Sequence, residues 1–363
     1  MKILLIGPVP PPVTGVSVSN QIIIDNFSLY FPMSVIENIN TNALNLNGKI
    51  GKFSWEKFIF YVEKYREVNK IFRYDKIYLT IGLTFLGVLK YAPFILLAKI
   101  LKKEVIIHIH SDYLWQEYYL LNVYFRSIFK TILSLADKGI VLSPLLKRNI
   151  EPFLSDRDIF VVPNCVNDNL FQFNLAQKIE NKFDKLRIVY LSNLLEEKGI
   201  FDLLEALRIL KESNISFEAN LAGSLESGLE TRILDIIEML APETRYLGVV
   251  VGEEKKRLLV NSNVFVLPTY YSMEGQPISI LEAMATGNLV LTTMHAGIPD
   301  IFQDGINGYY VEKRSPASII EKLLNIQKSF EKQKGIALIN YITAHNNYKI
   351  ESFILGINQV LEK

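Results

Sequence analysis

The strongest constraint on the fold is an alternation, repeated along the chain, between short β-rich apolar runs and longer stretches of helical pattern. The runs are rich in isoleucine and valine and nearly continuous in apolar character, which is typical of parallel strands covered on both faces. In the first half, strands are predicted at 2–7, 33–39, 76–82, 104–110, 138–143 and 159–164. In the second half, they are predicted at 186–192, 215–223, 244–250, 263–268, 288–293 and 307–311.

The segments between these runs are long enough for the crossover helices that parallel strands require. Helices are predicted at 53–73, 84–101, 115–135, 199–212, 226–240, 253–261 and 278–286. A chain of 363 residues exceeds one ordinary hydrophobic core, so two doubly wound α/β domains are expected. The polar stretch 169–185 marks their connection. The domains are therefore predicted at 1–168 and 169–345, with a C-terminal helix within 346–363 packing back on the first.

Composition excludes several classes of protein. With 49% hydrophobic and 21% charged residues, disorder is not expected. A net charge of +1 gives no sign of a nucleic-acid binder. Cys165 is the single cysteine, which excludes an intramolecular disulfide framework and a multi-cysteine metal site. A reducing cytoplasm fits this composition best.

Membrane contact is a separate question. The N-terminal apolar run is too short for a secretory signal, and the stretch 81–101 contains Lys90, Pro93 and Lys99, so a buried helix is expected rather than a span. Residues 1–168 carry 19 Lys and Arg against 14 Asp and Glu, which favours an anionic acceptor or membrane surface. Aromatic and basic residues interleave over 53–74, as in interfacial helices, although a surface helix packed on its sheet is the alternative.

The most informative segment is EGQPISILEAMATG, residues 274–287, which follows a predicted strand. Ligands bind at the carboxyl ends of strands in such sheets. Pro277 is predicted as the first helical residue and Gly287 as the stop. The helical period places Glu282 away from the core. The free N–H groups of the helix start can bind a phosphate, whereas the alternative is a solvated helix face.

This segment closely resembles the E(x7)E motif of the retaining glycosyltransferases of family 4 (glycosyl transferases group 1), enzymes with the GT-B fold. That fold consists of two Rossmann-like domains facing an interdomain cleft. The resemblance implies that Glu274 contacts hydroxyls of the transferred sugar and that Glu282 binds the ribose of the nucleotide. It also implies that the backbone of Gly275, Gln276 and Pro277 meets the diphosphate.

A second segment, residues 190–207, resembles the strand, loop and helix in which this family holds a basic pair against the diphosphate. Lys198 matches the lysine of that pair. Ser192 and Asn193 stand where a glycine and an arginine are usual, and asparagine carries no charge. Stabilisation of the leaving group would then depend on Lys198 and the helix start. The alternative for Lys198 is a solvated loop lysine.

Other matches are looser. Residues 295–311 resemble a pattern in which Gly297 and Ile298 bring backbone near the nucleotide or sugar, and Gly223 follows a strand as a donor-site candidate. Residues 162–168 resemble a segment near the domain junction and support the fold more than the chemistry. Gly15 ends a proline-rich loop where a helix should start, as in the family's loop near the donor phosphates.

A histidine pair follows a strand in the first half. His108 and His110 lie on one side of the strand by its period of two, and the resemblance places the sugar-contacting histidine at His110. A satisfied structural histidine is the alternative. Neither has companion ligands at metal spacing, so no metal site is predicted, and the Asp-x-Asp within 155–158 is discounted.

The resemblance implies a hexosyltransferase-type enzyme that retains anomeric configuration and needs no metal or other cofactor. The donor is expected to be a UDP-sugar, with a GDP-sugar as the alternative. The acceptor is expected to be a saccharide or lipid-linked saccharide in bacterial polysaccharide or glycolipid assembly, at the cytoplasmic face of the membrane. Two alternatives remain: a sugar-nucleotide 2-epimerase of the same fold, and a non-catalytic partner subunit that binds the nucleotide sugar.

Overall fold

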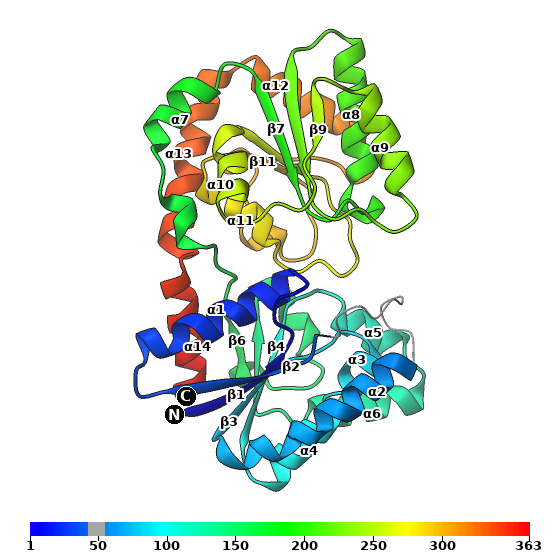
Figure 1. Ribbon diagram of the computed structural model, residues 1–363, viewed down its shortest axis with the longest axis vertical. Helices are drawn as coiled ribbons and strands as arrows, with labels where there is room; N and C mark the ends of the chain where they lie inside the picture. The colour runs from blue at the N-terminus through cyan, green and yellow to red at the C-terminus, as the bar shows by residue number, and fades with distance from the viewer. Residues whose placement is uncertain (43–54) are drawn as a thin grey trace. The chain divides into compact units, whose positions relative to one another are not determined.

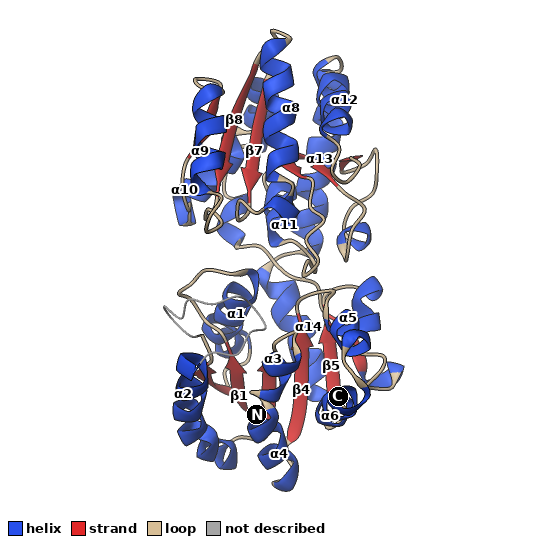
Figure 2. Ribbon diagram, turned by 90° about the vertical axis from the view of Figure 1, so that its right-hand side faces the viewer, coloured by secondary structure: helices blue, strands red, loops and turns tan. Residues whose placement is uncertain are grey.

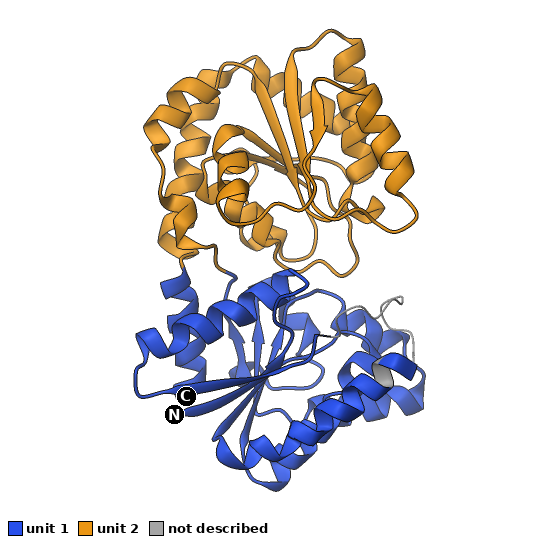
Figure 3. Cartoon of the chain, in the orientation of Figure 1, with its two compact units in different colours: residues 1–164, 350–363 blue, residues 165–349 orange. Residues whose placement is uncertain are grey.

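The computed structural model describes residues 1–42 and 55–363, and its chain is drawn in Figure 1. It divides into two compact units, coloured separately in Figure 3. Unit 1 comprises Met1–Asn164 and Ile350–Lys363, and unit 2 comprises Cys165–Lys349. Each unit contains one six-stranded parallel sheet with helices beside it, as Figure 2 shows in red and blue.

The sheet of unit 1 has the order β2-β1-β3-β4-β5-β6, and each of its six predicted strands is confirmed. The strands are β1 Lys2–Gly7, β2 Val35–Asn40, β3 Lys76–Thr80, β4 Glu104–Ile109, β5 Lys138–Val141 and β6 Ile159–Val161. The helices are α1 Gly15–Tyr30, α2 Trp55–Lys64, η1 Tyr65–Arg73, α3 Phe85–Leu89, α4 Ala92–Ile100, α5 Leu114–Leu120, α6 Val123–Leu133, η2 Pro144–Asn149, η3 Asp156–Asp158 and α14 Ile350–Glu362.

Three helices predicted as continuous in this unit are each divided in two. The α3–α4 division places Pro93 in the first turn of α4, where its missing N–H needs no partner. The α5–α6 division falls at Asn122, whose Oδ1 accepts from the backbone N–H groups of Tyr124 and Phe125 at 3.1 Å each.

In the described part of the chain, no helix combines the length and apolar character needed to cross a membrane.

The sheet of unit 2 has the order β12-β11-β10-β7-β8-β9, and its six predicted strands are also confirmed. The strands are β7 Leu186–Leu191, β8 Phe217–Ala222, β9 Thr244–Tyr246, β10 Val264–Leu267, β11 Leu289–Thr292 and β12 Gly308–Tyr310. The helices are η4 Asp168–Phe171, α7 Leu175–Lys182, η5 Glu196–Lys198, α8 Ile200–Glu212, α9 Glu230–Met239, α10 Gly252–Asn261, α11 Ile278–Ala285, η6 Ile298–Asp300, α12 Pro316–Gln327 and α13 Phe330–Asn347.

The stretch 169–185, predicted as a linker, is part of the body of unit 2. Its helix α7 contains Lys178, of which only 3% is exposed. The Lys178 ammonium donates to the carbonyls of Leu259 at 3.0 Å and Thr286 at 2.6 Å, and to Oδ1 of Asn288 at 3.1 Å. Burial lowers the pKa of Lys178 well below its usual value. Polar composition therefore misled the prediction, because the amino group of this lysine is hydrogen-bonded inside the fold.

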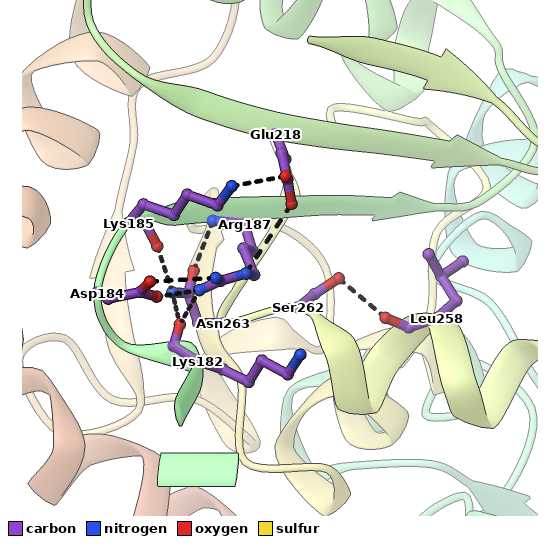
Figure 4. Close-up of polar contacts among 8 residues, drawn as sticks. All are labelled: Lys182, Asp184, Lys185, Arg187, Glu218, Leu258, Ser262 and Asn263. Atoms are coloured by element: carbon purple, nitrogen blue, oxygen red, sulfur yellow. Dashed lines mark hydrogen bonds and ion pairs between the residues drawn. The ribbon is translucent and has the colours of Figure 1, made fainter. Parts of the chain in front are cut away.

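A buried amide connects the starts of two central strands of unit 2 (Figure 4). Asn263, just before β10, accepts at Oδ1 from the N–H of Arg187 at 2.9 Å and donates to the carbonyl of Lys185 at 2.7 Å. It also donates to the carbonyl of Lys182 at the end of α7. Asn263 has no exposed surface, so a side chain shielded from solvent links α7, β7 and β10 through these hydrogen bonds.

We predict that Asn263→Leu lowers the free energy of unfolding by about 2 kcal/mol, because the carbonyl of Lys185 and the N–H of Arg187 lose the hydrogen-bond partner that Asn263 gives them. Urea unfolding measures the change. Ser262→Ala is the matched control, since the hydroxyl donates only within its own helix, to Leu258 at 2.9 Å. Equal losses in the two variants would contradict this account.

The C-terminal helix α14 belongs to unit 1. The ammonium of Lys138, on β5, donates to the carbonyl of Val360 at 3.0 Å, and α1 packs against α14. The unit boundary lies at Asn164 and Cys165, four residues before the predicted position. The preceding helix, α13, packs against α11 in unit 2.

Candidate functional site

The helix of the E(x7)E segment begins one residue later than predicted. Pro277 is the N-cap of α11, with φ −64° and ψ 115°, and the first helical residue is Ile278. The extended ψ of Pro277 excludes it from the helix, although its carbonyl accepts from the N–H of Ile280 at 3.2 Å. Gly287 ends the helix as predicted, with φ +66° and its N–H donated to Met284 at 2.9 Å.

Lys198 and Glu274, far apart in sequence, form a largely buried ion pair. The Lys198 ammonium lies 2.6 Å from Oε2 of Glu274, and the hydroxyl of Thr269 donates to the same oxygen at 3.0 Å. Their side chains are 13% and 8% exposed, so Lys198 is not a solvated loop lysine. Lys198 also lies 4.9 Å from the ring centroid of Tyr271. The structure thus brings together two residues that the sequence predicted separately.

The segment that carries Lys198 is hydrogen-bonded to the loop after β10. The carbonyl of Glu197 accepts from the N–H of Tyr270 at 2.7 Å, and its carboxylate accepts from the N–H of Ser272 at 3.1 Å. Gly199 has φ +78°, and a Cβ there would lie 2.5 Å from the carbonyl oxygen of Pro268. These contacts hold the lysine against the glutamate.

Glu282 is buried, which corrects the prediction that it lies away from the core. It is 7% exposed, and its Oε1 pairs with the ammonium of Lys255 on the neighbouring helix α10. The helical period described α11 alone and could not show that Lys255 of α10 reaches its polar side. Sequence reasoning missed Lys255 because it stands in the charged run 253–257, which is typical of a solvated surface.

The two pairs share one feature. Lysine contacts one oxygen of each carboxylate, Oε2 of Glu274 and Oε1 of Glu282. In the described parts of the chain, the other oxygen of each has no hydrogen-bond partner, and neither is fully enclosed. Each glutamate is thus oriented by a cation and retains an acceptor for a hydroxyl group.

Asn193 and Gly223 lie in adjacent loops after β7 and β8. Oδ1 of Asn193 accepts from the hydroxyl of Ser224 at 2.8 Å, so this exposed side chain supplies hydrogen bonds and no charge. Gly223 has φ +143°, and a Cβ there would lie 1.8 Å from the carbonyl oxygen of Ser192. Close packing of the two loops therefore explains the glycine without a ligand.

The predicted backbone contacts of the 295–311 segment are used within the fold. The N–H of Gly297 donates to the carbonyl of Gly275 at 3.0 Å, and the N–H of Ile298 donates to His295 at 3.0 Å. Ile298 has no exposed surface, and Gln276 is 4% exposed. This segment therefore braces the loop before α11, and its predicted approach to the nucleotide or sugar stays a prediction.

His108 and His110 of unit 1 lie side by side with their rings tilted by 41°, and the strand period predicted that they share one side. The ring centroids of His108 and His110 lie 3.9 Å apart, and Tyr78 contacts Nδ1 of His108. Nε2 of His110 is enclosed and has no partner among residues 1–42 and 55–363. Burial lowers the pKa of His110 to about 3, so its ring is neutral at physiological pH. The direct contact of His110 with a sugar stays a prediction.

We predict that His110 makes the protein less stable at acidic pH. Below its ordinary pKa of about 6.5 the unfolded chain binds a proton that the folded ring excludes until about pH 3, so stability is lost as pH falls between these values. The loss is about 1.4 kcal/mol per pH unit. Urea unfolding of His110→Gln should show a difference between pH 7 and pH 5 smaller by about 2 kcal/mol. An unchanged difference would contradict the burial.

The predicted helix start at Gly15 is confirmed. Gly15 is the first residue of α1, and the Thr14 hydroxyl accepts from the N–H of Ser17 at 3.1 Å. The Ser17 hydroxyl accepts in turn from the N–H of Thr14 at 2.8 Å, which completes a capping box.

Within the described residues, no three His, Cys, Asp or Glu side chains gather closely enough to hold a metal ion.

The sequence of this chain is similar to those of known glycosyltransferases. Residues 172–337 match the family model for glycosyl transferases group 1. The chain is 33% identical over 163 residues to the amylovoran biosynthesis glycosyltransferase AmsK of Erwinia amylovora, covering 43% of this chain and 39% of that protein. It is 31% identical over 144 residues to the putative colanic acid biosynthesis glycosyltransferase WcaL of Escherichia coli K12, covering 38% and 35%. It thus spans about two fifths or less of these relatives.

Solved structures match the whole chain. Anabaena Alr3699/HepE in complex with UDP has a TM-score of 0.74 at 16% identity, with complete coverage of both chains. Sucrose-phosphate synthase from Thermosynechococcus elongatus has a TM-score of 0.75 at 16% identity, covering 99% of this chain and 98% of that one. At such identity the likeness shows the fold alone, and that fold is GT-B.

Proposed function

We propose, from the match of residues 172–337 to the family model for glycosyl transferases group 1, that this chain transfers a sugar from a nucleotide-sugar donor to a saccharide in polysaccharide biosynthesis. The named roles of its relatives in amylovoran and colanic acid biosynthesis support this proposal. The proposed acceptor is a saccharide or lipid-linked saccharide.

The observation that carries the proposal is the pair of lysine-held carboxylates at the two ends of one short segment. Glu274 and Glu282 each keep one oxygen free of hydrogen bonds within the described residues, and a sugar nucleotide offers hydroxyl groups on its sugar and on its ribose. We assign the sugar to Glu274 and the ribose to Glu282. Lys198 and the start of α11 would stabilise the negative charge of the departing diphosphate.

A UDP-sugar is the proposed donor, because a structural neighbour was crystallised with UDP. Transfer is proposed to retain anomeric configuration through front-face attack, in which the leaving diphosphate accepts the proton of the acceptor hydroxyl. The charge would come from Lys198, so the proposal needs no metal ion. On this account the protein mainly positions two substrates.

Contact with the cytoplasmic face of a membrane is proposed for unit 1. The predicted interfacial segment 53–74 begins outside the described residues, but its described part exposes Trp55 by 70%, Ile59 by 57% and Phe72 by 60%. Such apolar exposure beside lysine and arginine is typical of surface association with anionic lipid. Flotation with anionic vesicles tests this idea, and failure to float would remove it.

The central test is a screen of nucleotide sugars by thermal shift, followed by assays of sugar release and transfer. A ligand that binds the folded state raises the melting temperature, by an amount that grows with its concentration. UDP-sugars should produce the largest shift. Absence of a shift with every UDP- and GDP-sugar would contradict the proposed function.

A non-catalytic subunit is the second candidate, supported by Asn193. This neutral residue stands where the family's arginine is expected, and its Oδ1 is engaged by Ser224. Donor binding with no sugar release in any acceptor mixture would favour this reading. Restoration of transfer by Asn193→Arg would show that the missing charge is responsible.

A further inference from the structure

We propose that Lys255 is a positioning residue for nucleoside binding, which holds Glu282 so that its free oxygen faces the hydroxyl groups of a ribose. The inference rests on the proposed function, because it assumes that Glu282 meets the nucleotide. It adds a residue outside the recognised motif and a specificity for ribonucleotides over deoxyribonucleotides.

The pair joins two helices that are separate in sequence. Lys255 lies near the start of α10 and Glu282 in the middle of α11, and the ammonium contacts only Oε1. Oε2 has no hydrogen-bond partner among residues 1–42 and 55–363. Because one oxygen is held, rotation of the carboxylate is restricted and the second oxygen keeps one direction.

Because the carboxylate of Glu282 is buried, its orientation depends on the ammonium of Lys255. The Glu282 side chain is 9% exposed, whereas that of Lys255 is 26% exposed and can remain hydrated. A buried carboxylate without a cation tends to turn toward water. This change would remove the acceptor from the nucleoside end of the site.

A second lysine keeps the two helices in register. Lys178 donates to the carbonyl of Leu259 near the end of α10 at 3.0 Å and to that of Thr286 at the end of α11 at 2.6 Å. The amide of Asn288 also donates to Leu259 at 3.0 Å. The C-terminal ends of both helices are therefore connected through buried groups, which limits their relative movement and supports the Lys255–Glu282 contact.

A ribose is the natural partner of this arrangement. Its 2′ and 3′ hydroxyls are donors, and hydrogen bonds to an ionised carboxylate are stronger than those between neutral groups. A nucleotide lacking both hydroxyls would leave Oε2 without a partner. Discrimination between the two nucleotides should therefore depend on Lys255, which an exposed surface ion pair would not produce.

The test measures dissociation constants of UDP and GDP, and of their 2′,3′-dideoxy forms, by titration calorimetry with the full chain. The variants are Lys255→Met and Lys255→Arg, with Lys334→Met as the control. Lys334 has a similarly exposed side chain, at 28%, and pairs with Glu331, which is 87% exposed.

Wild-type protein should bind the ribonucleotide at least about tenfold more tightly than its dideoxy form. Lys255→Met should weaken ribonucleotide binding about tenfold and bring the two dissociation constants close together. Lys255→Arg should restore most of the preference, and Lys334→Met should leave it unchanged.

The alternative outcomes separate this inference from the proposed function. If wild-type protein binds no nucleotide, the proposed function fails. If wild-type protein prefers the ribonucleotide and Lys255→Met keeps that preference, with or without a uniform loss of affinity, the positioning role of Lys255 is wrong. Equal binding of both forms by wild-type protein would also overturn it.

Discussion

Replacing Glu274 by glutamine is expected to lower the turnover number of sugar transfer about a hundredfold or more, with little change in nucleotide affinity. Glutamine keeps the size of the side chain and can accept from Thr269, but it lacks the charge that pairs with Lys198. The freed ammonium remains available to the diphosphate, so binding of the nucleotide should persist. Steady-state kinetics with saturating donor, together with titration of UDP, measures both quantities.

Glu282→Gln is the matched control for this prediction. The same chemical change at the other end of the segment should weaken nucleotide binding about tenfold and leave turnover at saturating donor within a few fold. Wild-type turnover in Glu274→Gln, or the same pattern of defects in both variants, would show that the two carboxylates do not have the assigned roles.

Replacing Gly223 by alanine is expected to destabilise unit 2 by about 4 kcal/mol. The added Cβ would lie 1.8 Å from the carbonyl oxygen of Ser192, and the backbone has φ +143°. The neighbour is main chain, so relief requires that the loops after β7 and β8 move apart. Urea unfolding of the purified variant gives the change in free energy.

Gly228→Ala, in the same loop, measures the cost of backbone strain without the steric clash that an added Cβ makes at Gly223. Gly228 has φ +88°, but nothing lies within 4 Å of an added Cβ. Only the backbone strain remains, so a loss of about 1 to 2 kcal/mol is expected. Equal destabilisation in the two variants would contradict the claim that close packing of the loops requires Gly223.

The strands were predicted well because their signal is local. Apolar runs such as 104–110 and 263–268 are buried on both faces, and neighbouring residues in sequence report this directly. Helix boundaries were less accurate where a cap outweighed the periodic pattern, as at Asn122. Polarity was misleading at Lys178, whose ammonium is satisfied by three buried acceptors.

The candidate site was predicted in part for the same reason. Glu274, Glu282 and Lys198 lie in motifs with characteristic spacing, so the sequence indicated them. The contact between Lys198 and Glu274 spans 76 positions, and Lys255 belongs to no motif. Close packing of two loops accounts for Gly223, and the N–H of Gly297 donates to Gly275, whereas the predicted approach of both residues to a ligand stays a prediction.

The amino-acid sequence by itself determined the order of strands and helices and the segment that carries the two carboxylates, since these depend on short-range patterns of polarity and on turn residues. Only the tertiary structure decided that Glu282 is buried, that Lys255 holds it, and that Nε2 of His110 is enclosed, which favours a neutral ring. Burial and ion pairing depend on which distant segments pack together, and a single helix cannot specify the neighbour that covers its polar side.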